Sequence, residues 1–198
     1  MLLPEGLNIR RNTAILAAVL AVYVAVLSLA AAVLSLTFVL VTGFRSLLGL
    51  GPAIYLAAAA LSALPVGRAM DRFGRVPVIA TGFVLGSVGC AVTAAGTHWD
   101  SATAVIAGFV LIGVSGSVTL LIRTAAGDMY PPERRARGIS LVLFGSVFGA
   151  ILGPAVFGPL FSDKDVAAST LTVPWLAAAG MSLVASAIGS TVRRSNKH

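Results

Sequence analysis

Apolar residues fill this sequence in six long runs, which short polar or glycine-rich segments separate. A helix needs about 20 consecutive apolar residues to cross the hydrocarbon core of a bilayer. Each run reaches about that length, so the pattern predicts an all-α membrane protein with six transmembrane helices. The expected helices cover residues 13–39, 47–66, 76–95, 102–122, 139–161 and 171–192.

Composition supports a membrane protein and argues against two other classes, a water-soluble domain and a nucleic-acid-binding protein. Only 11% of the 198 residues are charged, whereas soluble domains carry about 25%. The formal net charge of +7 would suit a nucleic-acid-binding protein, but the basic residues cluster at the ends of the apolar runs, where they act as topology signals. We therefore expect the lipid bilayer as a partner and no nucleic acid. The single cysteine, Cys90, excludes an intrachain disulfide and a cysteine-based metal site. We expect no metal and no cofactor.

The first apolar run has a competing interpretation as a signal peptide, with a small-residue cleavage site at residues 30–32. The sequence stays uncharged from Asn12 to Phe44, however, which is too long for such a peptide. A first membrane helix is the better interpretation, with Arg10 and Arg11 as its cytoplasmic anchor.

The basic residues also predict the orientation. With both termini inside, twelve of the fourteen lysines and arginines fall in inner segments, and only Arg45 and Lys164 fall in outer ones. Because Lys and Arg favour cytoplasmic loops, we expect cytoplasmic termini at residues 1–12 and 193–198. Residues 13–192 then form the transmembrane domain in the cell (inner) membrane. The inner basic residues are Arg10, Arg11, Arg68, Arg72, Arg75, Arg123, Arg134, Arg135, Arg137, Arg193, Arg194 and Lys197.

The segment between the second and third runs carries a specific motif. Gly67, Asp71, Arg72, Gly74 and Arg75 form the pattern G-x-x-x-D-R-x-G-R. It resembles the loop signature of major facilitator superfamily transporters, without the extra basic residue that many members carry next. We expect a tight turn in which Gly67 ends one helix and Gly74 supplies a conformation that other residues resist. Asp71 should lie just before the next helix, near its positive end.

The segment after the fourth run resembles the second cytoplasmic loop of the same superfamily, with an acidic residue, a proline pair and an arginine cluster. We expect a gate here, in which Arg123 pairs with Asp71 or Asp128, unless Arg123 only snorkels to the headgroups. The gate candidates are Arg123, Asp128, Arg134 and Arg135.

The fifth run contains a glycine series similar to a motif of the antiporter branch, with Phe157 in place of one final glycine. The same spacing would also serve as a packing groove for another helix, and both interpretations stay open. The motif residues are Gly145, Gly149, Gly153, Pro154 and Gly158.

The resemblance implies one half of a transporter whose two six-helix halves are related by an axis along the membrane normal, with the solute site between them. This chain resembles the N-terminal half throughout. Three interpretations follow: an inactive transporter fragment, one subunit of a split transporter, or a protomer of a homodimer. In the homodimer, Asp71 would meet the start of the fifth helix of the other copy.

The resemblance also implies that the first and fourth helices line the solute path. No charged residue lies in the central part of any expected helix, so a proton-coupling carboxylate is missing. The arginine that many relatives carry in the first half of the fourth helix is missing as well. A largely apolar path favours efflux of small hydrophobic or amphipathic solutes, and sugars and metabolites stay open as alternatives. The polar candidates are Tyr23, Ser28, Ser115, Ser117 and Thr119.

One enzyme class fits a short motif in the fourth run. Residues 113–116 read G-V-S-G, which resembles the G-x-S-G of rhomboid intramembrane proteases. The serine of such an enzyme needs a histidine base within hydrogen-bond reach. The chain has only His98, in an outer loop, and His198 near its end. We therefore expect a transporter and not an enzyme, with Ser115 as a packing residue or a wall of the solute path.

Overall fold

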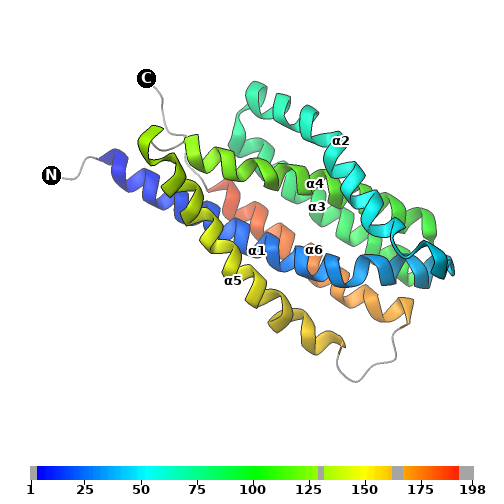
Figure 1. Cartoon of the computed structure of the whole chain (residues 1–198). Coiled ribbons are helices and arrows are strands. Elements are labelled where there is room, and N and C mark those ends of the chain that lie inside the picture. The colour runs from blue at the N-terminus through cyan, green and yellow to red at the C-terminus, as the bar shows by residue number, and fades with distance from the viewer. Residues whose placement is uncertain (1–3, 129–131, 162–166, 192–198) are drawn as a thin grey trace.

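Six long helices make up most of the described part of this chain (Figure 1). The computed structural model describes residues 4–128, 132–161 and 167–191, and the side chains of 11–121, 133–155 and 167–191 within them. Each helix contains a span long and apolar enough to cross a membrane, which confirms the six-helix prediction. The helices are α1 Pro4–Thr42, α2 Leu50–Phe73, α3 Arg75–His98, α4 Ala102–Asp128, α5 Arg135–Phe161 and α6 Thr172–Ser190. Single-turn 3₁₀ helices at Arg45–Leu47, Pro132–Arg134 and Ala168–Leu171 precede α2, α5 and α6.

The helix α2 extends further than its apolar run, which corrects two expectations about the signature motif. It continues through Pro65 to Phe73, so Gly67 does not end it, and Asp71 lies in its last turn and not just before α3. The turn is Gly74 alone, at φ +87° and ψ 160°, in a region of backbone conformation that is essentially restricted to glycine. The prediction of a special conformation at Gly74 is confirmed. The helix outlasts its apolar run because its backbone bonds internally while charged side chains reach out to water.

The chain passes back and forth along the bundle. Figure 1 shows the start of α1, the α2–α3 turn and the end of α6 at one end of the molecule. Arg11 donates a hydrogen bond of 3.2 Å to the carbonyl oxygen of Thr191, which ties the start of α1 to the end of α6. Successive loops therefore lie at opposite ends of the bundle, which agrees with the predicted alternation of inner and outer loops. Which end faces the cytoplasm stays a prediction from the charge distribution.

Glycines bring α3 and α4 into close contact. A Cβ on Gly82 would lie 2.5 Å from a methyl carbon of Val118, and a Cβ on Gly89 would lie 2.9 Å from the Ile112 backbone nitrogen. Small residues at helical spacing allow such close approach in lipid. Helix α3 also packs on α6, while α1 contacts α5 and α6, and α2 rests on α4.

Hydrogen bonds that involve hydroxyl groups connect α6 to α3 and to α1. Ser87 of α3 donates a hydrogen bond of 2.8 Å to the Ala179 carbonyl of α6, and Ser186 of α6 donates one of 2.9 Å to the Ala80 carbonyl of α3. The indole N–H of Trp175 donates to Thr37 Oγ1 of α1 at 3.1 Å. Each bond satisfies a polar side chain inside an apolar bundle, where an unpaired group is costly.

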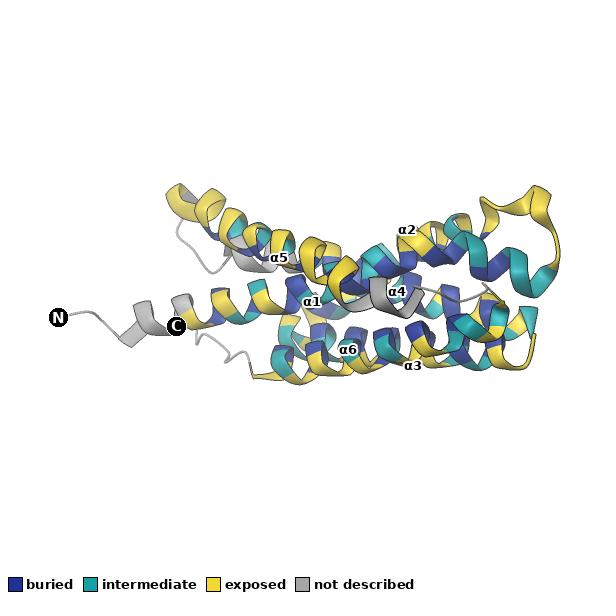
Figure 2. Ribbon diagram, turned by 90° about the horizontal axis from the view of Figure 1, so that it is seen from below, coloured by how far each residue is buried: buried dark blue, intermediate teal, exposed yellow. Residues whose placement is uncertain are grey.

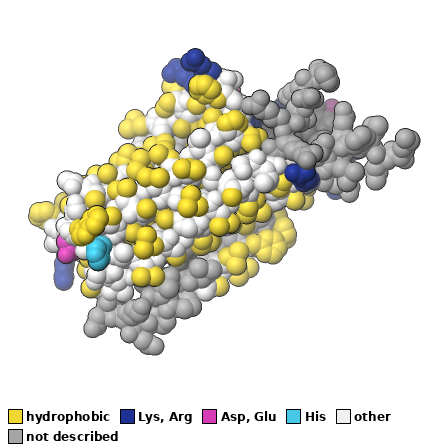
Figure 3. Space-filling view, turned by 180° about the vertical axis from the view of Figure 1, so that it is seen from behind, with side chains coloured by type: hydrophobic (Ala, Val, Ile, Leu, Met, Phe, Trp, Pro, Cys, Tyr) yellow, Lys and Arg dark blue, Asp and Glu magenta, His cyan; other side chains and the backbone are white. Residues whose placement is uncertain are grey.

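Two helices leave most of their apolar surface uncovered (Figure 2). Only 11% of the α2 span and 28% of the α5 span are buried, against 44–56% for the other four. Figure 3 shows hydrophobic side chains across the middle of one face, with the described charged side chains at its margins. The lateral surface is therefore suited to lipid or to another apolar protein surface.

Candidate functional site

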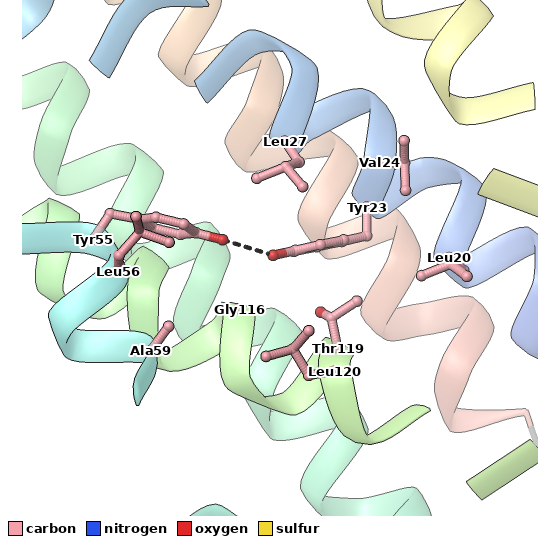
Figure 4. A pocket seen from close by; sticks show the side chains of 10 residues that line it. All are labelled: Leu20, Tyr23, Val24, Leu27, Tyr55, Leu56, Ala59, Gly116, Thr119 and Leu120. Atoms are coloured by element: carbon pink, nitrogen blue, oxygen red, sulfur yellow. Dashed lines mark hydrogen bonds between the residues drawn. The ribbon is translucent and has the colours of Figure 1, made fainter. Parts of the chain in front are cut away.

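A pocket of about 160 Å³ lies between α1, α2 and α4 (Figure 4). Leu56 and Leu120 at its edge are each more than half exposed, so the pocket opens to the surface of the described bundle. The polar side chains that line it are two tyrosines and one threonine, and none of the ten lining residues is charged. The lining residues are Leu20, Tyr23, Val24, Leu27, Tyr55, Leu56, Ala59, Gly116, Thr119 and Leu120.

A pair of tyrosines forms the polar part of this pocket. The hydroxyl of Tyr23 on α1 and that of Tyr55 on α2 are 3.0 Å apart and hydrogen-bonded, and either can be the donor (Figure 4). The ring of Tyr23 also meets the ring of Phe83 on α3 edge to face, with centroids 6.1 Å apart. The hydrogen bond thus connects α1 to α2 across the pocket, and the contact with Phe83 helps to hold the ring of Tyr23 in place.

Gly116 of α4 lies directly against both hydroxyls. A Cβ at this position would lie 2.8 Å from Tyr55 Oη and 3.2 Å from Tyr23 Oη. Because real Cβ atoms almost never come within 3.0 Å of another atom, a side chain at position 116 would displace the hydroxyl of Tyr55. The absence of a side chain therefore makes room for this hydrogen bond.

The rest of the G-V-S-G segment packs helices together. A Cβ on Gly113 would collide with the carbonyl oxygen of Tyr55, so α2 lies directly on α4 there. Ser115 is buried and faces Gly86 of α3. His98 lies at the end of α3, about 18 Å from Gly86 at 1.5 Å per residue. The only histidine whose side chain the structure describes is therefore too distant to act as a base for Ser115, and His198 lies outside the described residues.

Two of the five predicted path residues line the pocket, Tyr23 and Thr119. Thr119 donates a hydrogen bond of 3.3 Å to the Ser115 carbonyl of its own helix. Ser28 donates to the Val24 carbonyl and lies against Gly153 of α5.

Ser117 is fully buried and donates to the Val114 carbonyl. Ser28, Ser115 and Ser117 are therefore not among the pocket residues. Tyr55 is a pocket residue that the sequence analysis missed. The sequence marks it only as a lone tyrosine in the apolar second run. The resemblance assigns the first and fourth helices to the solute path and not the second.

The glycine series of α5 is in contact with α1. A Cβ on Gly145 or Gly149 would collide with the carbonyl oxygens of Ala17 and Ala21, respectively. A Cβ on Gly153 would lie 2.7 Å from Ser28 Cβ. These three glycines thus act as a packing groove. Pro154 beside them is exposed, and the surroundings of Gly158 lie outside the described residues.

The charged residues of the signature motif lie on the surface. Asp71, Arg72 and Arg75 are exposed, and the Arg72 guanidinium lies 5.3 Å from the centroid of the Phe73 ring. A Cβ on Gly67 would meet no atom within 4 Å, so the close approach expected at this glycine does not occur within the described chain.

The second group of gate candidates is only partly described. Arg134 and Arg135 are exposed. Arg123 and Asp128 belong to α4, but their side chains lie outside the described residues. The pairing of Arg123 with an aspartate stays a prediction.

Comparison with known proteins identifies a family of transporters. Residues 15–197 match the model of the Major Facilitator Superfamily. An uncharacterized MFS-type transporter of Bacillus subtilis, YddS, is 24% identical over 148 residues, which are 74% of this chain and 34% of that protein. A triacylglyceride transporter of Mycobacterium tuberculosis is 36% identical over 99 residues, 48% of this chain and 18% of that one. The gallate transporter of Pseudomonas putida is 38% identical over 105 residues, 49% of this chain and 22% of that one.

A solved structure shares the fold. The inward-open xylose transporter XylE from E. coli superimposes with a TM-score of 0.62 at 18% identity, over 93% of this chain and 48% of XylE. The chain therefore spans about a third or less of the curated relatives it matches and about half of XylE.

Proposed function

Because this chain belongs to the Major Facilitator Superfamily, we propose that it acts as one six-helix half of a transporter whose solute path includes the pocket at Tyr23 and Tyr55. Family and fold make the chain an integral, multi-pass membrane protein of a transporter family. The observation that supports the path is the pocket itself, since it opens to the surface and its lining comes from three membrane helices.

The lining favours a hydrophobic or amphipathic solute. Seven of the ten lining residues are Leu, Val, Ala or Gly, and a charged solute would lose its hydration there without a counter-charge. The names of two relatives point to different solutes, triacylglycerides and gallate. The apolar lining supports the lipid-like class for this chain. Since such solutes enter a bilayer unaided, we propose efflux as the direction.

Transport needs a second six-helix unit in this proposal. The uncovered apolar surfaces of α2 and α5 and the empty space next to Gly67 are where such a unit would pack. A second copy of this chain, related by the axis along the membrane normal, would provide it. Asp71 of one copy would then contact the start of α5 in the other copy. This contact would hold the cytoplasmic side of the transporter closed.

An accumulation assay tests this proposal. Cells that lack their own efflux pumps are loaded with radiolabelled toluene, an uncharged hydrophobic solute of one aromatic ring, with and without the expressed chain. We expect the chain to lower the steady-state toluene content. Leu56→Trp, which fills the pocket from α2, should abolish the effect.

The matched control is Leu61→Trp, because Leu61 lies on the same helix, is 80% exposed and does not line the pocket. Leu61→Trp should keep the effect. Equal toluene content with the chain and with an empty vector would contradict transport by this chain alone and favour the inactive fragment.

A further inference from the structure

We propose that the pocket recognises an uncharged solute with an apolar body and a single hydroxyl group, and that Tyr55 binds this hydroxyl while Tyr23 holds Tyr55 in position. The inference deepens the proposed function and rests on the pocket being a solute site. It names the class of solute and the two residues that select it.

The hydrogen-bonding capacity of Tyr55 supports this assignment. A phenol hydroxyl has one proton to donate and two lone pairs to accept with. The bond to Tyr23, at 3.0 Å, uses either the proton of Tyr55 or one of its lone pairs. If Tyr55 donates its proton to Tyr23, both of its lone pairs remain for the solute, and if it accepts from Tyr23, its proton and one lone pair remain. A solute hydroxyl can therefore bind Tyr55 without breaking the tyrosine pair.

The surrounding residues keep the two hydroxyls in place. Gly116 supports the pair from α4, with no side chain to displace it, and Phe83 holds the ring of Tyr23 from α3. A hydroxyl group that is fixed before the solute arrives loses little conformational entropy on binding. Tyr23 thus acts as a positioning residue for Tyr55.

The lining also limits what the rest of the solute can be. With no charge among the ten lining residues, a carboxylate or an ammonium group would be buried there unpaired, which is strongly unfavourable. A dry cavity of about 150 Å³ binds benzene in another protein, and this pocket measures about 160 Å³. An apolar body of one aromatic ring therefore fits the pocket. A solute without a hydroxyl would enter but gain nothing from the tyrosines.

A protection experiment with phenol and toluene tests the inference, because the two probes have nearly the same size and only phenol has a hydroxyl. Leu56→Cys puts a thiol at the pocket edge, and its labelling by a maleimide is followed on the full chain in detergent micelles. The control variant is Leu61→Cys. The parent chain serves as the blank, because its Cys90 is buried.

We expect both probes to slow labelling at position 56 and not at position 61. In the Tyr23→Phe, Tyr55→Phe double variant, the phenol concentration for half-protection should rise roughly fivefold, the change that one net hydrogen bond makes. Tyr55→Phe alone should raise it by at least twofold, and Tyr23→Phe alone by less than Tyr55→Phe. The value for toluene should not change in any of the three variants.

The possible outcomes separate the inference from the proposed function. If both probes protect but the double variant leaves the phenol value unchanged, recognition by the tyrosines is wrong, while the pocket remains a solute site. If Tyr23→Phe affects phenol more than Tyr55→Phe does, the assignment of the contacting residue is wrong. If neither probe protects position 56, both the inference and the pocket as a solute site are overturned.

Discussion

Gly86 of α3 and Ser115 of α4 lie in direct contact, such that a Cβ on Gly86 would come 2.5 Å from Ser115 Oγ and 2.9 Å from Ser115 Cβ. Gly86→Ala would therefore force the two helices apart. We expect it to lower the free energy of unfolding by about 1–3 kcal/mol, as overpacking usually does. Unfolding by SDS in mixed micelles measures this change.

The rescue variant for this prediction is Ser115→Gly, which removes both atoms that the new methyl group would meet. The Gly86→Ala, Ser115→Gly pair should recover most of the lost stability. Ser115→Ala should rescue less, since its Cβ remains. Equal stability of Gly86→Ala and the parent chain would contradict the close contact of α3 and α4.

Gly116→Ala tests the contact between α4 and the tyrosine pair. The new methyl group would lie 2.8 Å from Tyr55 Oη, so we expect a loss of about 1–3 kcal/mol in the free energy of unfolding. The loss should be smaller in a Tyr55→Phe background, because the nearest atom is gone. The four chains of this double-mutant cycle give the coupling energy directly. A cost that is the same in both backgrounds would show that residue 116 does not touch the hydroxyl.

Two glycines of the signature motif should respond in opposite ways to alanine. Gly74 has φ +87° and ψ 160°, so Gly74→Ala should destabilise the chain by about 1–3 kcal/mol. Gly67 lies inside α2, where an added Cβ would meet no atom within 4 Å. Gly67→Ala should therefore stabilise the isolated chain by up to about 1 kcal/mol through helix propensity. Thermal unfolding of both variants in detergent compares them.

The response of Gly67 to a larger side chain reports on a second six-helix unit. Gly67→Leu should be tolerated by a monomer, because the space there is open. In a transporter whose other half packs against this end of α2, Gly67→Leu should reduce the assembly of the two halves. Transport that survives Gly67→Leu unchanged would argue against packing at this position.

The predicted topology can be tested with reporter fusions. Reporters placed after Asp100 and Asp163 should report an outer location, and those after Arg75 and Arg135 an inner one. The reason is the charge bias, with twelve of fourteen basic residues in segments predicted to be cytoplasmic. An outer location at either of the two arginines would refute the orientation.

The homodimer can be tested by crosslinking between differently tagged copies. One copy carries Asp71→Cys and the other Arg137→Cys, a position that is exposed at the start of α5, whereas the adjacent Gly138 is buried. Oxidation in membranes should give a product that contains both tags. Each variant expressed alone is the control. Purified protein that is monomeric and never forms this product would leave the homodimer without support.

The sequence was sufficient to predict the six helices, because their apolar runs are long and almost free of charge. The prediction ended α2 too early, at residue 66, whereas the helix continues to Phe73. The last turns of a membrane helix can stand outside the hydrocarbon core, with Asp71 and Arg72 in water. The pocket was harder to predict. Three of the candidate hydroxyls, on Ser28, Ser115 and Ser117, turned out to lie outside it, with Ser28 and Ser117 bonded to their own helix backbones, as short polar side chains often are. The sequence marks Tyr55 only as a lone tyrosine in an apolar run, and its partner Tyr23 lies on another helix.

The hydrogen bond from Trp175 to Thr37 gives the protein an internal optical reporter. Of the two tryptophans in the chain, Trp175 is fully buried between α6 and α1, whereas Trp99 is 72% exposed at the end of α3. A water-soluble quencher such as acrylamide will therefore extinguish the emission of Trp99 and leave that of Trp175. In a Trp99→Phe chain the remaining tryptophan fluorescence comes from Trp175 alone, whose indole is bonded to Thr37 of α1. Its wavelength will shift to the red whenever those two helices separate and water reaches the indole.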